Sequence, residues 1–166
     1  MKHILLPVLV ALVLVSCVSS PLRYVSTVED KYNDGIVSVS LLGLAPDGSA
    51  SPQGLTVQLG NGGNSPITVE WQKSTFFVDG APNPVYVENS ASGYGGAKGV
   101  PPESIVKAGS HIAATAYPAN NVASSAGGWG PPKLAIQPLN SRHVTLSICV
   151  SAAGQDRFYA LTVAME

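Results

Sequence analysis

The sequence contains few of the residues from which catalytic and metal-binding sites are usually built. Its 166 residues include only 2 cysteines and 3 histidines, and 11% of them are charged. The cysteines, Cys17 and Cys149, allow at most one disulfide bond, which excludes a disulfide framework. The histidines beyond the first few residues, His111 and His143, are too few and too far apart in sequence to suggest a metal site. We therefore expect neither a metal ion nor another cofactor.

The sequence also lacks an excess of positive or negative charge. The chain carries 9 basic and 10 acidic side chains, has a formal net charge of -1 and contains no basic cluster. A nucleic-acid-binding surface needs such a cluster. The composition therefore argues against nucleic acid as a partner.

Motifs for nucleophilic or phosphate chemistry are incomplete. Ser104 and Lys107 have the serine and lysine spacing of penicillin-binding enzymes, but they lie in strand-like sequence, where residues three apart point to opposite faces. The glycine-rich residues 93–99 lack the Gly-Lys-Ser or Gly-Lys-Thr ending of a phosphate-binding loop. Three aspartates stand in or beside glycine turns, where a β fold uses them structurally: Asp47, Asp79 and Asp156. We therefore expect that the protein is not an enzyme.

The long hydrophobic run of the sequence lies at its start. Residues 4–15 are apolar and follow Lys2 and His3, and a small, polar stretch begins at Ser16. A membrane-spanning helix needs roughly 17 to 25 apolar residues, so this run is short for a span and has the length of a signal-peptide core. The pattern predicts an export signal.

The end of this run carries a more specific motif. Leu14-Val15-Ser16-Cys17 resembles the lipobox of bacterial lipoproteins, with leucine three residues before the cysteine and a small residue directly before it. The resemblance implies that the signal is cut before Cys17, that the thiol of Cys17 carries a diacylglyceryl group, and that its new amino group is usually acylated. More than one acyl chain gives stable anchoring. The expected location is the cell membrane or outer membrane, facing the periplasm or exterior, and Val18 resembles cargo sent to the outer membrane.

An alternative is an ordinary secretory signal that is cleaved nearby, with Cys17 as a bystander. Under the lipoprotein hypothesis the chain divides into a signal peptide (residues 1–16), a lipidated tether (17–34) and one domain (35–166), the tether passing into a first element near its end. The 150 residues after the signal are enough for a single domain with a core. Cys149 lies in an apolar stretch, so we expect it to be buried.

The remainder of the chain has the alternating pattern of strands, and no segment after the signal has a helical period. We therefore expect an all-β domain. In residues 67–72 the alternation is clearest, with Ile67, Val69 and Trp71 on the inward face. The expected strands cover residues 36–44, 55–59, 67–72, 75–78, 85–88, 105–107, 111–117, 134–136, 144–150 and 158–163. Residues 105–107 and 111–117 could form a hairpin or two successive edges.

The strand pattern also resembles a known class of domain. Leu-Thr-Val-Gln-Leu (55–59), a turn with Asn64, Ile-Thr-Val-Glu-Trp (67–71) and the turn at Asp79-Gly80 are similar to small immunoglobulin-like envelope domains and to water-stress, LEA-type domains. The similarity covers about residues 54–88. It implies a single immunoglobulin-like antiparallel β-sandwich.

Two glycine-rich regions offer candidate contact residues. Tyr94 lies within residues 89–102, and Trp129 stands between glycines within residues 118–132. The favoured hypothesis is a lipid-anchored binding or structural module that holds an envelope protein or a peptidoglycan-associated component. The alternative is a small-ligand carrier for a sugar or peptide, or a hydrolase, with its site between these loops, where Tyr94 and Trp129 would stack on the ligand. A further alternative is that Trp129 plugs one end of the core.

Overall fold

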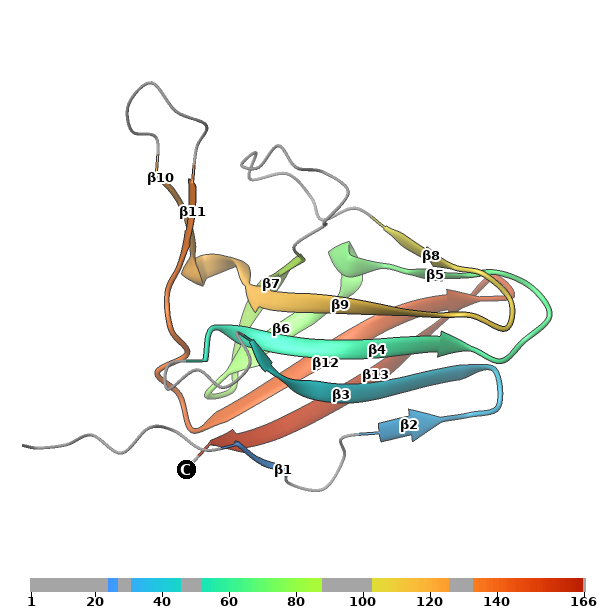
Figure 1. The fold of residues 1–166 in the computed structure, drawn as a ribbon, viewed down its shortest axis with the longest axis horizontal. Coiled ribbons are helices and arrows are strands. Elements are labelled where there is room, and N and C mark those ends of the chain that lie inside the picture. Colours follow the sequence, from blue (N-terminus) through green and yellow to red (C-terminus); the bar gives the residue numbers. More distant parts are fainter. Residues whose placement is uncertain (1–23, 27–30, 46–51, 88–102, 126–132, 166) are drawn as a thin grey trace, which may run out of the picture.

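The computed structural model describes residues 24–26, 31–45, 52–87, 103–125 and 133–165, and these residues form an all-β protein (Figure 1). The predicted class is therefore confirmed. Within this part of the chain the helical segments are two 3₁₀ turns, η1 (Trp71–Lys73) and η2 (Ala119–Asn121). The strands are β1 (Tyr24–Ser26), β2 (Lys31–Asn33), β3 (Val37–Ala45), β4 (Gly54–Asn61), β5 (Ile67–Val69), β6 (Thr75–Val78), β7 (Ala81–Val87), β8 (Ser104–Val106), β9 (His111–Pro118), β10 (Val122–Ser125), β11 (Lys133–Ile136), β12 (His143–Ala152) and β13 (Gln155–Met165).

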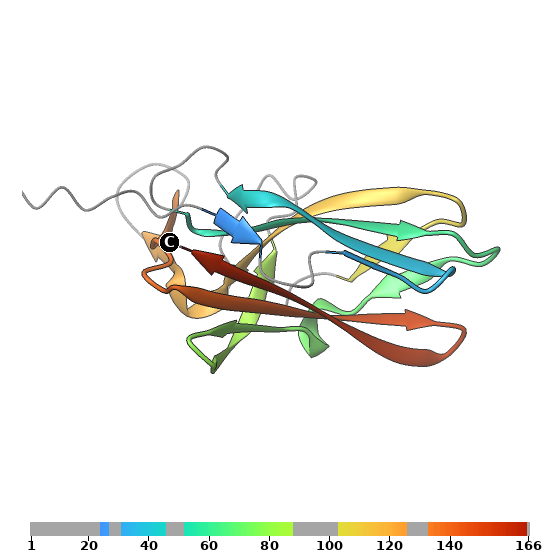
Figure 2. The same ribbon diagram turned by 90° about the horizontal axis from the view of Figure 1, so that it is seen from below.

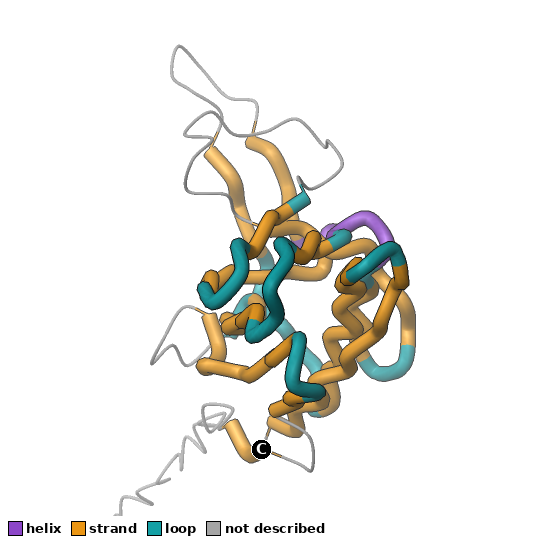
Figure 3. The backbone as a smooth tube through the Cα atoms, turned by 90° about the vertical axis from the view of Figure 1, so that its right-hand side faces the viewer, coloured by secondary structure: helices purple, strands orange, loops and turns teal. Residues whose placement is uncertain are grey.

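The strands belong to one long antiparallel sheet and one separate ribbon. The sheet has the order β1-β13-β12-β6-β7-β9-β4-β3-β2, with β5 paired to β12 and β8 paired to β5, whereas β10 and β11 pair only with each other. The first half of β7 pairs with β6 and its second half, Val85 to Val87, pairs with β9. At β7 the sheet therefore passes from a first layer (β1, β13, β12, β5, β6, β8) to a second layer (β9, β4, β3, β2). Figures 2 and 3 show the two layers facing each other.

The core lies between these layers because one face of each long strand is apolar. Leu55, Val57 and Leu59 of β4 are fully buried, as are Leu161 and Val163 of β13. Their sequence neighbours Thr56, Gln58 and Thr162 are half-buried on the outer faces. The period-two pattern of the sequence therefore predicts correctly which face of these strands is buried.

Two-residue turns join the pairs β6–β7 and β12–β13. Asp79 and Gly80 have φ values of 49° and 79°, and Ala153 and Gly154 have φ values of 51° and 75°. Left-handed conformations at both central residues are typical of tight hairpin turns, because their twist matches that of the strands. The predicted turn at Asp79-Gly80 is thus confirmed, and Ala153-Gly154 forms a second turn of the same kind.

The strand predicted over residues 67–72 is interrupted. Its inward face is confirmed, since Ile67, Val69 and Trp71 are all buried, but the strand ends at Val69 and Trp71 begins η1. Strands β5 and β6 then pair with opposite halves of β12. The prediction that Trp71 lies in a strand was wrong, because alternation alone cannot show where a strand stops pairing with its neighbour.

Ser74 maintains the hydrogen bonding where the strand is interrupted. The amide of Cys149 donates to Ser74 Oγ at 3.0 Å, and Ser74 Oγ donates to the carbonyl of Glu70 at 2.9 Å. The amide of Glu70 in turn donates to the carbonyl of Cys149 at 2.8 Å. A serine side chain thus replaces one backbone partner in the ladder, so no polar group is left unsatisfied there. Cys149 itself is buried, as predicted, and burial raises the pKa of its thiol.

The structure also assigns strands for which the sequence left alternatives open or predicted no strand. β8 pairs with β5 and β9 pairs with β4 and β7, so residues 105–107 and 111–117 are successive strands in different layers rather than a hairpin. β10 lies in a region expected to be irregular. β1 and β2 lie within residues 17–34 and pair with β13 and β3.

Candidate functional site

The residues that the sequence singles out for function lie outside the described residues. Cys17 precedes β1, Tyr94 falls between β7 and β8 in sequence, and Trp129 falls between β10 and β11. Lipidation at Cys17, ligand contacts at Tyr94 and Trp129, and the alternative of Trp129 as a core plug stay predictions.

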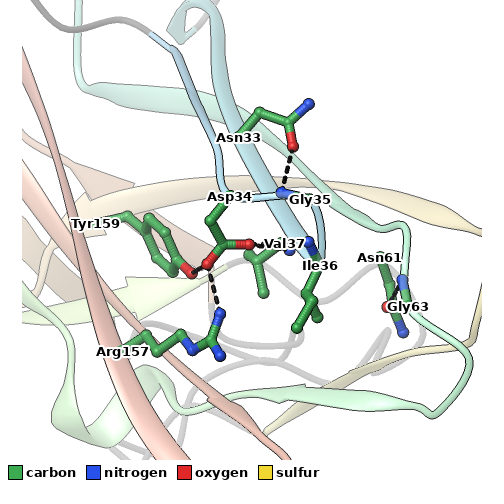
Figure 4. Close-up of polar contacts among 9 residues, drawn as sticks. All are labelled: Asn33, Asp34, Gly35, Ile36, Val37, Asn61, Gly63, Arg157 and Tyr159. Atoms are coloured by element: carbon green, nitrogen blue, oxygen red, sulfur yellow. Dashed lines mark hydrogen bonds and ion pairs between the residues drawn. The ribbon is translucent and has the colours of Figure 1, made fainter.

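The best-defined polar group in the described structure surrounds Asp34, in the turn between β2 and β3 (Figure 4). Arg157 Nη1 donates to Asp34 Oδ2 at 2.6 Å, and the Tyr159 hydroxyl donates to the same oxygen at 2.8 Å. Arg157 and Tyr159 are two residues apart on β13 and therefore point to the same side of that strand. We call Asp34, Arg157, Tyr159 and Tyr32 the Asp34 cluster.

The local sequence Asn33-Asp34-Gly35 explains why the carboxylate lies there. Gly35 has a φ of 86°, and its amide donates to Asn33 Oδ1 at 2.9 Å. Asp34 Oδ1 accepts from the amides of Ile36 at 2.9 Å and Val37 at 2.7 Å. Aspartate and asparagine side chains commonly hold turns through such bonds. The turn therefore fixes one carboxylate oxygen and presents the other to β13.

The hydrogen bonds control ionisation in the cluster. Partial burial raises the pKa of Asp34, but the bonds from the Val37 and Ile36 amides, the Tyr159 hydroxyl and the Arg157 guanidinium outweigh it and hold the pKa well below its usual range. Burial, followed by donation to Asp34, raises the pKa of Tyr159 to about 12. At neutral pH the carboxylate is charged and the phenol is protonated, as the hydrogen bonds require.

Tyr32 of β2 completes the connection between the layers. Its hydroxyl donates to the carbonyl of Ala160 on β13 at 2.8 Å, and its ring meets that of Tyr159 edge-on with 5.9 Å between centroids. The second layer is thereby joined to the first along the outer edge of β13. Asp34 accepts four hydrogen bonds, which is the full capacity of a carboxylate. The arrangement is suited to bracing the fold and leaves no lone pair for a metal ion or a substrate proton.

A second group contains the residue types of a hydrolase, namely Ser141, Asp79 and His143. Ser141 Oγ lies 2.7 Å from Asp79 Oδ1 and 2.8 Å from the carbonyl of His143, and it accepts from the amide of His143 at 3.2 Å. The amide of Asp79 also donates to the carbonyl of His143 at 3.0 Å. Nucleophilic catalysis needs the serine hydroxyl to face an imidazole nitrogen. Here the hydroxyl contacts the backbone of His143, so the group holds the β6–β7 turn against the start of β12.

The other residues considered from sequence have structural surroundings as well. Ser104, of the Ser104/Lys107 pair, accepts a hydrogen bond from Trp71 Nε1 at 2.9 Å through its Oγ. Its hydroxyl is therefore a partner of a core side chain. His111 and His143 are exposed at the starts of β9 and β12. Within the described ranges, no three His, Cys, Asp or Glu side chains are grouped to hold a metal ion. No helix in that part of the chain is long and apolar enough to cross a membrane.

The sequence Asn33-Asp34-Gly35 is typical of a turn, but it does not show the function of Asp34. The sequence carries one signal for the cluster. Arg157 and Tyr159 are two residues apart, on the strand face that continues with the aliphatic residues Leu161 and Val163. A charged and a phenolic side chain on a core face require partners. The sequence does not show which of the 10 acidic residues would supply one.

Comparisons with protein-family models, with curated proteins and with solved structures found no match.

Proposed function

We propose that the protein is a lipid-anchored module of a bacterial cell envelope that acts by binding or by structural support and not by catalysis. The observation that carries this proposal is the tetrapeptide Leu14-Val15-Ser16-Cys17 at the end of a short apolar run. A cysteine acylated at this position would tie the following domain to the cell membrane or outer membrane. The partner would be an envelope protein or a peptidoglycan-associated component.

The folded part would be an immunoglobulin-like sandwich. Strands β3, β4 and β9 with the second half of β7 pair in the manner of strands A, B, E and D of such domains, and β5/β6, β12 and β13 pair in the manner of C, F and G. Trp71 supports the same assignment, because it is buried directly after the strand that corresponds to C. This domain class presents loops at both ends of the sandwich, where binding residues commonly lie.

The surroundings of the polar side chains favour a structural or binding function. The carboxylate of Asp34 joins the two layers, Ser141 holds a turn, and Ser74 repairs the ladder beside Cys149. In each group the hydrogen-bonding capacity serves the backbone or an edge of the sheet. These groups therefore stabilise the scaffold on which binding loops would be displayed.

Lipidation is tested by metabolic labelling of a bacterial expression host with a fatty-acid analogue. The wild-type chain should incorporate the label and partition into detergent, whereas Cys17→Ser should do neither. Cys149→Ala is the matched control, because Cys149 is the other cysteine and lies in the core, and it should be labelled like the wild type.

Two results would contradict the proposal. Label retained in Cys17→Ser would place the acyl group elsewhere. A wild-type chain that is cleaved, unlabelled and water-soluble would indicate the ordinary secretory signal instead.

A further inference from the structure

The strand pairing places the start of the described chain at one end of the domain. Tyr24 pairs with Met165 and Val25 pairs with Ala164, at the last residues of β13. Ala164 pairs with His143, whose carbonyl accepts the amide of Asp79 at 3.0 Å. β1, the last residues of β13, the start of β12 and the Asp79-Gly80 turn therefore lie together, at the left of Figure 1. We call this end of the domain the tether end.

The opposite end is formed by four turns. β13 begins there, after the Ala153-Gly154 turn, and Arg157 holds the turn at Asp34. The loop of residues 61–66 meets the turn of residues 107–110, because the amide of Asn61 donates to the carbonyl of Ser110 at 2.9 Å. We call this the distal end. The eleven residues of β13 separate the two ends by roughly 34 Å at about 3.4 Å per residue.

We propose that the tether end faces a lipid surface and that the distal end points away from it. This inference rests on the proposed lipidation of Cys17. Seven peptide units connect Cys17 to Tyr24, and at full extension they span at most about 25 Å. An anchor at Cys17 therefore keeps the tether end within about 25 Å of the membrane, a shorter distance than the length of β13.

The sides of the domain offer little to hold it flat on a bilayer. Among the described residues, the four exposed large apolar side chains belong to four different elements, namely the β2–β3 turn, β3, β8 and β13: Ile36, Leu42, Ile105 and Phe158. Because they belong to different elements, no single strand in the described part of the chain presents a row of exposed large apolar side chains to a bilayer. The ion pairs Lys73–Asp156 and Arg157–Asp34 neutralise charge near the distal end. The anchor then determines which end approaches the lipid.

The orientation has a consequence for binding. The turns of the distal end would reach up to about 60 Å from the lipid surface, the sum of the extended tether and the length of β13. Partners located away from the membrane would meet these turns first. The Asp79-Gly80 turn and the segment before β12 would face the bilayer.

Fluorescence quenching from a lipid surface tests the orientation. In a Cys149→Ala background, Asn140→Cys places a thiol at the tether end and Gln155→Cys places one at the distal end, both at exposed positions. The full lipidated chain would be purified from membranes, labelled with a thiol-reactive fluorophore and reconstituted into phosphatidylcholine vesicles whose headgroups carry a quencher. Acylation of Cys17 prevents labelling there.

We expect quenching at position 140 to be several-fold greater than at position 155. Equal quenching, or greater quenching at position 155, would overturn the orientation while leaving the anchor intact. Failure of both labelled chains to associate with vesicles would overturn the proposed lipidation and the inference with it. The two failures are distinguished by flotation of the vesicles, which reports anchoring independently of quenching.

Discussion

Replacing Trp71 by alanine tests whether the break between β5 and β6 is a packed part of the core. The side chain is 1% exposed and lies among the buried residues of both layers. Truncating a buried tryptophan typically costs about 3 to 5 kcal/mol, because apolar contacts are lost and a cavity remains. Ser104 also loses the donor that reaches it at 2.9 Å, which adds about 1 kcal/mol.

The expected loss is large compared with the whole free energy of unfolding, which is about 5 to 15 kcal/mol for a domain of this kind. Trp71→Ala should therefore lower the urea midpoint strongly, measured by far-ultraviolet circular dichroism. Trp71→Phe keeps most of the ring and loses the indole donor, so it should cost clearly less than the alanine variant. Gln72→Ala changes an exposed neighbour in the same 3₁₀ turn and should stay within about 0.5 kcal/mol of the wild type.

The comparison is decisive because Trp71 and Gln72 are adjacent in sequence and differ in burial. A Trp71→Ala chain that unfolds within about 1 kcal/mol of Gln72→Ala would refute the reasoning, since a ring packed in the core cannot be removed at so small a cost. An unchanged slope of free energy against urea in all three variants would show that the effect concerns stability alone.

Further predictions concern the hydrogen-bonded groups and one glycine. Asp34→Asn should lower the free energy of unfolding by about 1 kcal/mol at neutral pH, a figure discounted for the partial exposure of the carboxylate. The pKa of Asp34 is lower in the folded than in the unfolded state. The stabilisation by the Asp34 carboxylate is therefore present above the unfolded-state pKa of about 3.9 and is lost as the pH falls. Melting curves of wild type and variant should converge in acid, and a constant gap would contradict this. Ser74→Ala should cost about 1 to 3 kcal/mol in urea unfolding because it leaves the Cys149 amide unpaired, and a cost no greater than that of Ser40→Ala would argue against it. Gly54→Ala should destabilise the fold by about 1 to 3 kcal/mol, because a Cβ would meet Ala116 O and lie 2.6 Å from the Tyr117 ring. Gly43→Ala is the control and should cost little, because the space around Gly43 is open. Similar melting temperatures for the two variants would disprove the close approach at Gly54.

The positions of several strands were predictable because each of these strands carries its own pattern. The predicted strands at residues 55–59, 75–78 and 144–150 lie within β4, β6 and β12. In residues 55–59 and 144–148 burial of one face follows directly from alternation. The Asp79-Gly80 turn was equally local, since two residues that tolerate positive φ suffice to mark it.

The departures have non-local causes. Trp71 follows two correctly assigned inward residues, but the break before it depends on Ser74 reaching the Cys149 amide, 75 residues away in sequence. The Asp34 cluster joins residues 123 apart. Contacts over such separations form only when the two layers pack together, so no motif or regular spacing in the sequence reveals them. The predicted contact residues Tyr94 and Trp129 lie outside the described residues, so the structure tests neither.

The Asp34 cluster also bears on how an anchor would transmit force to the domain. Two short strands early in the chain contact β13 at different points. β1 forms three backbone pairs at residues 163–165, the last residues of β13. β2 reaches the middle of β13 through the Tyr32 hydroxyl bond to Ala160, and the Asp34 turn after β2 receives the bonds from Arg157 and Tyr159. A pull on Cys17 would load β1 first, and three residue pairs at an edge offer limited resistance. The load would then pass to β2 and the Asp34 cluster, whose charge-assisted bonds are stronger than neutral ones. The Asp34 cluster joins β2 and the turn after it to β13, so it would resist separation of these strands under a pull from an anchor at Cys17.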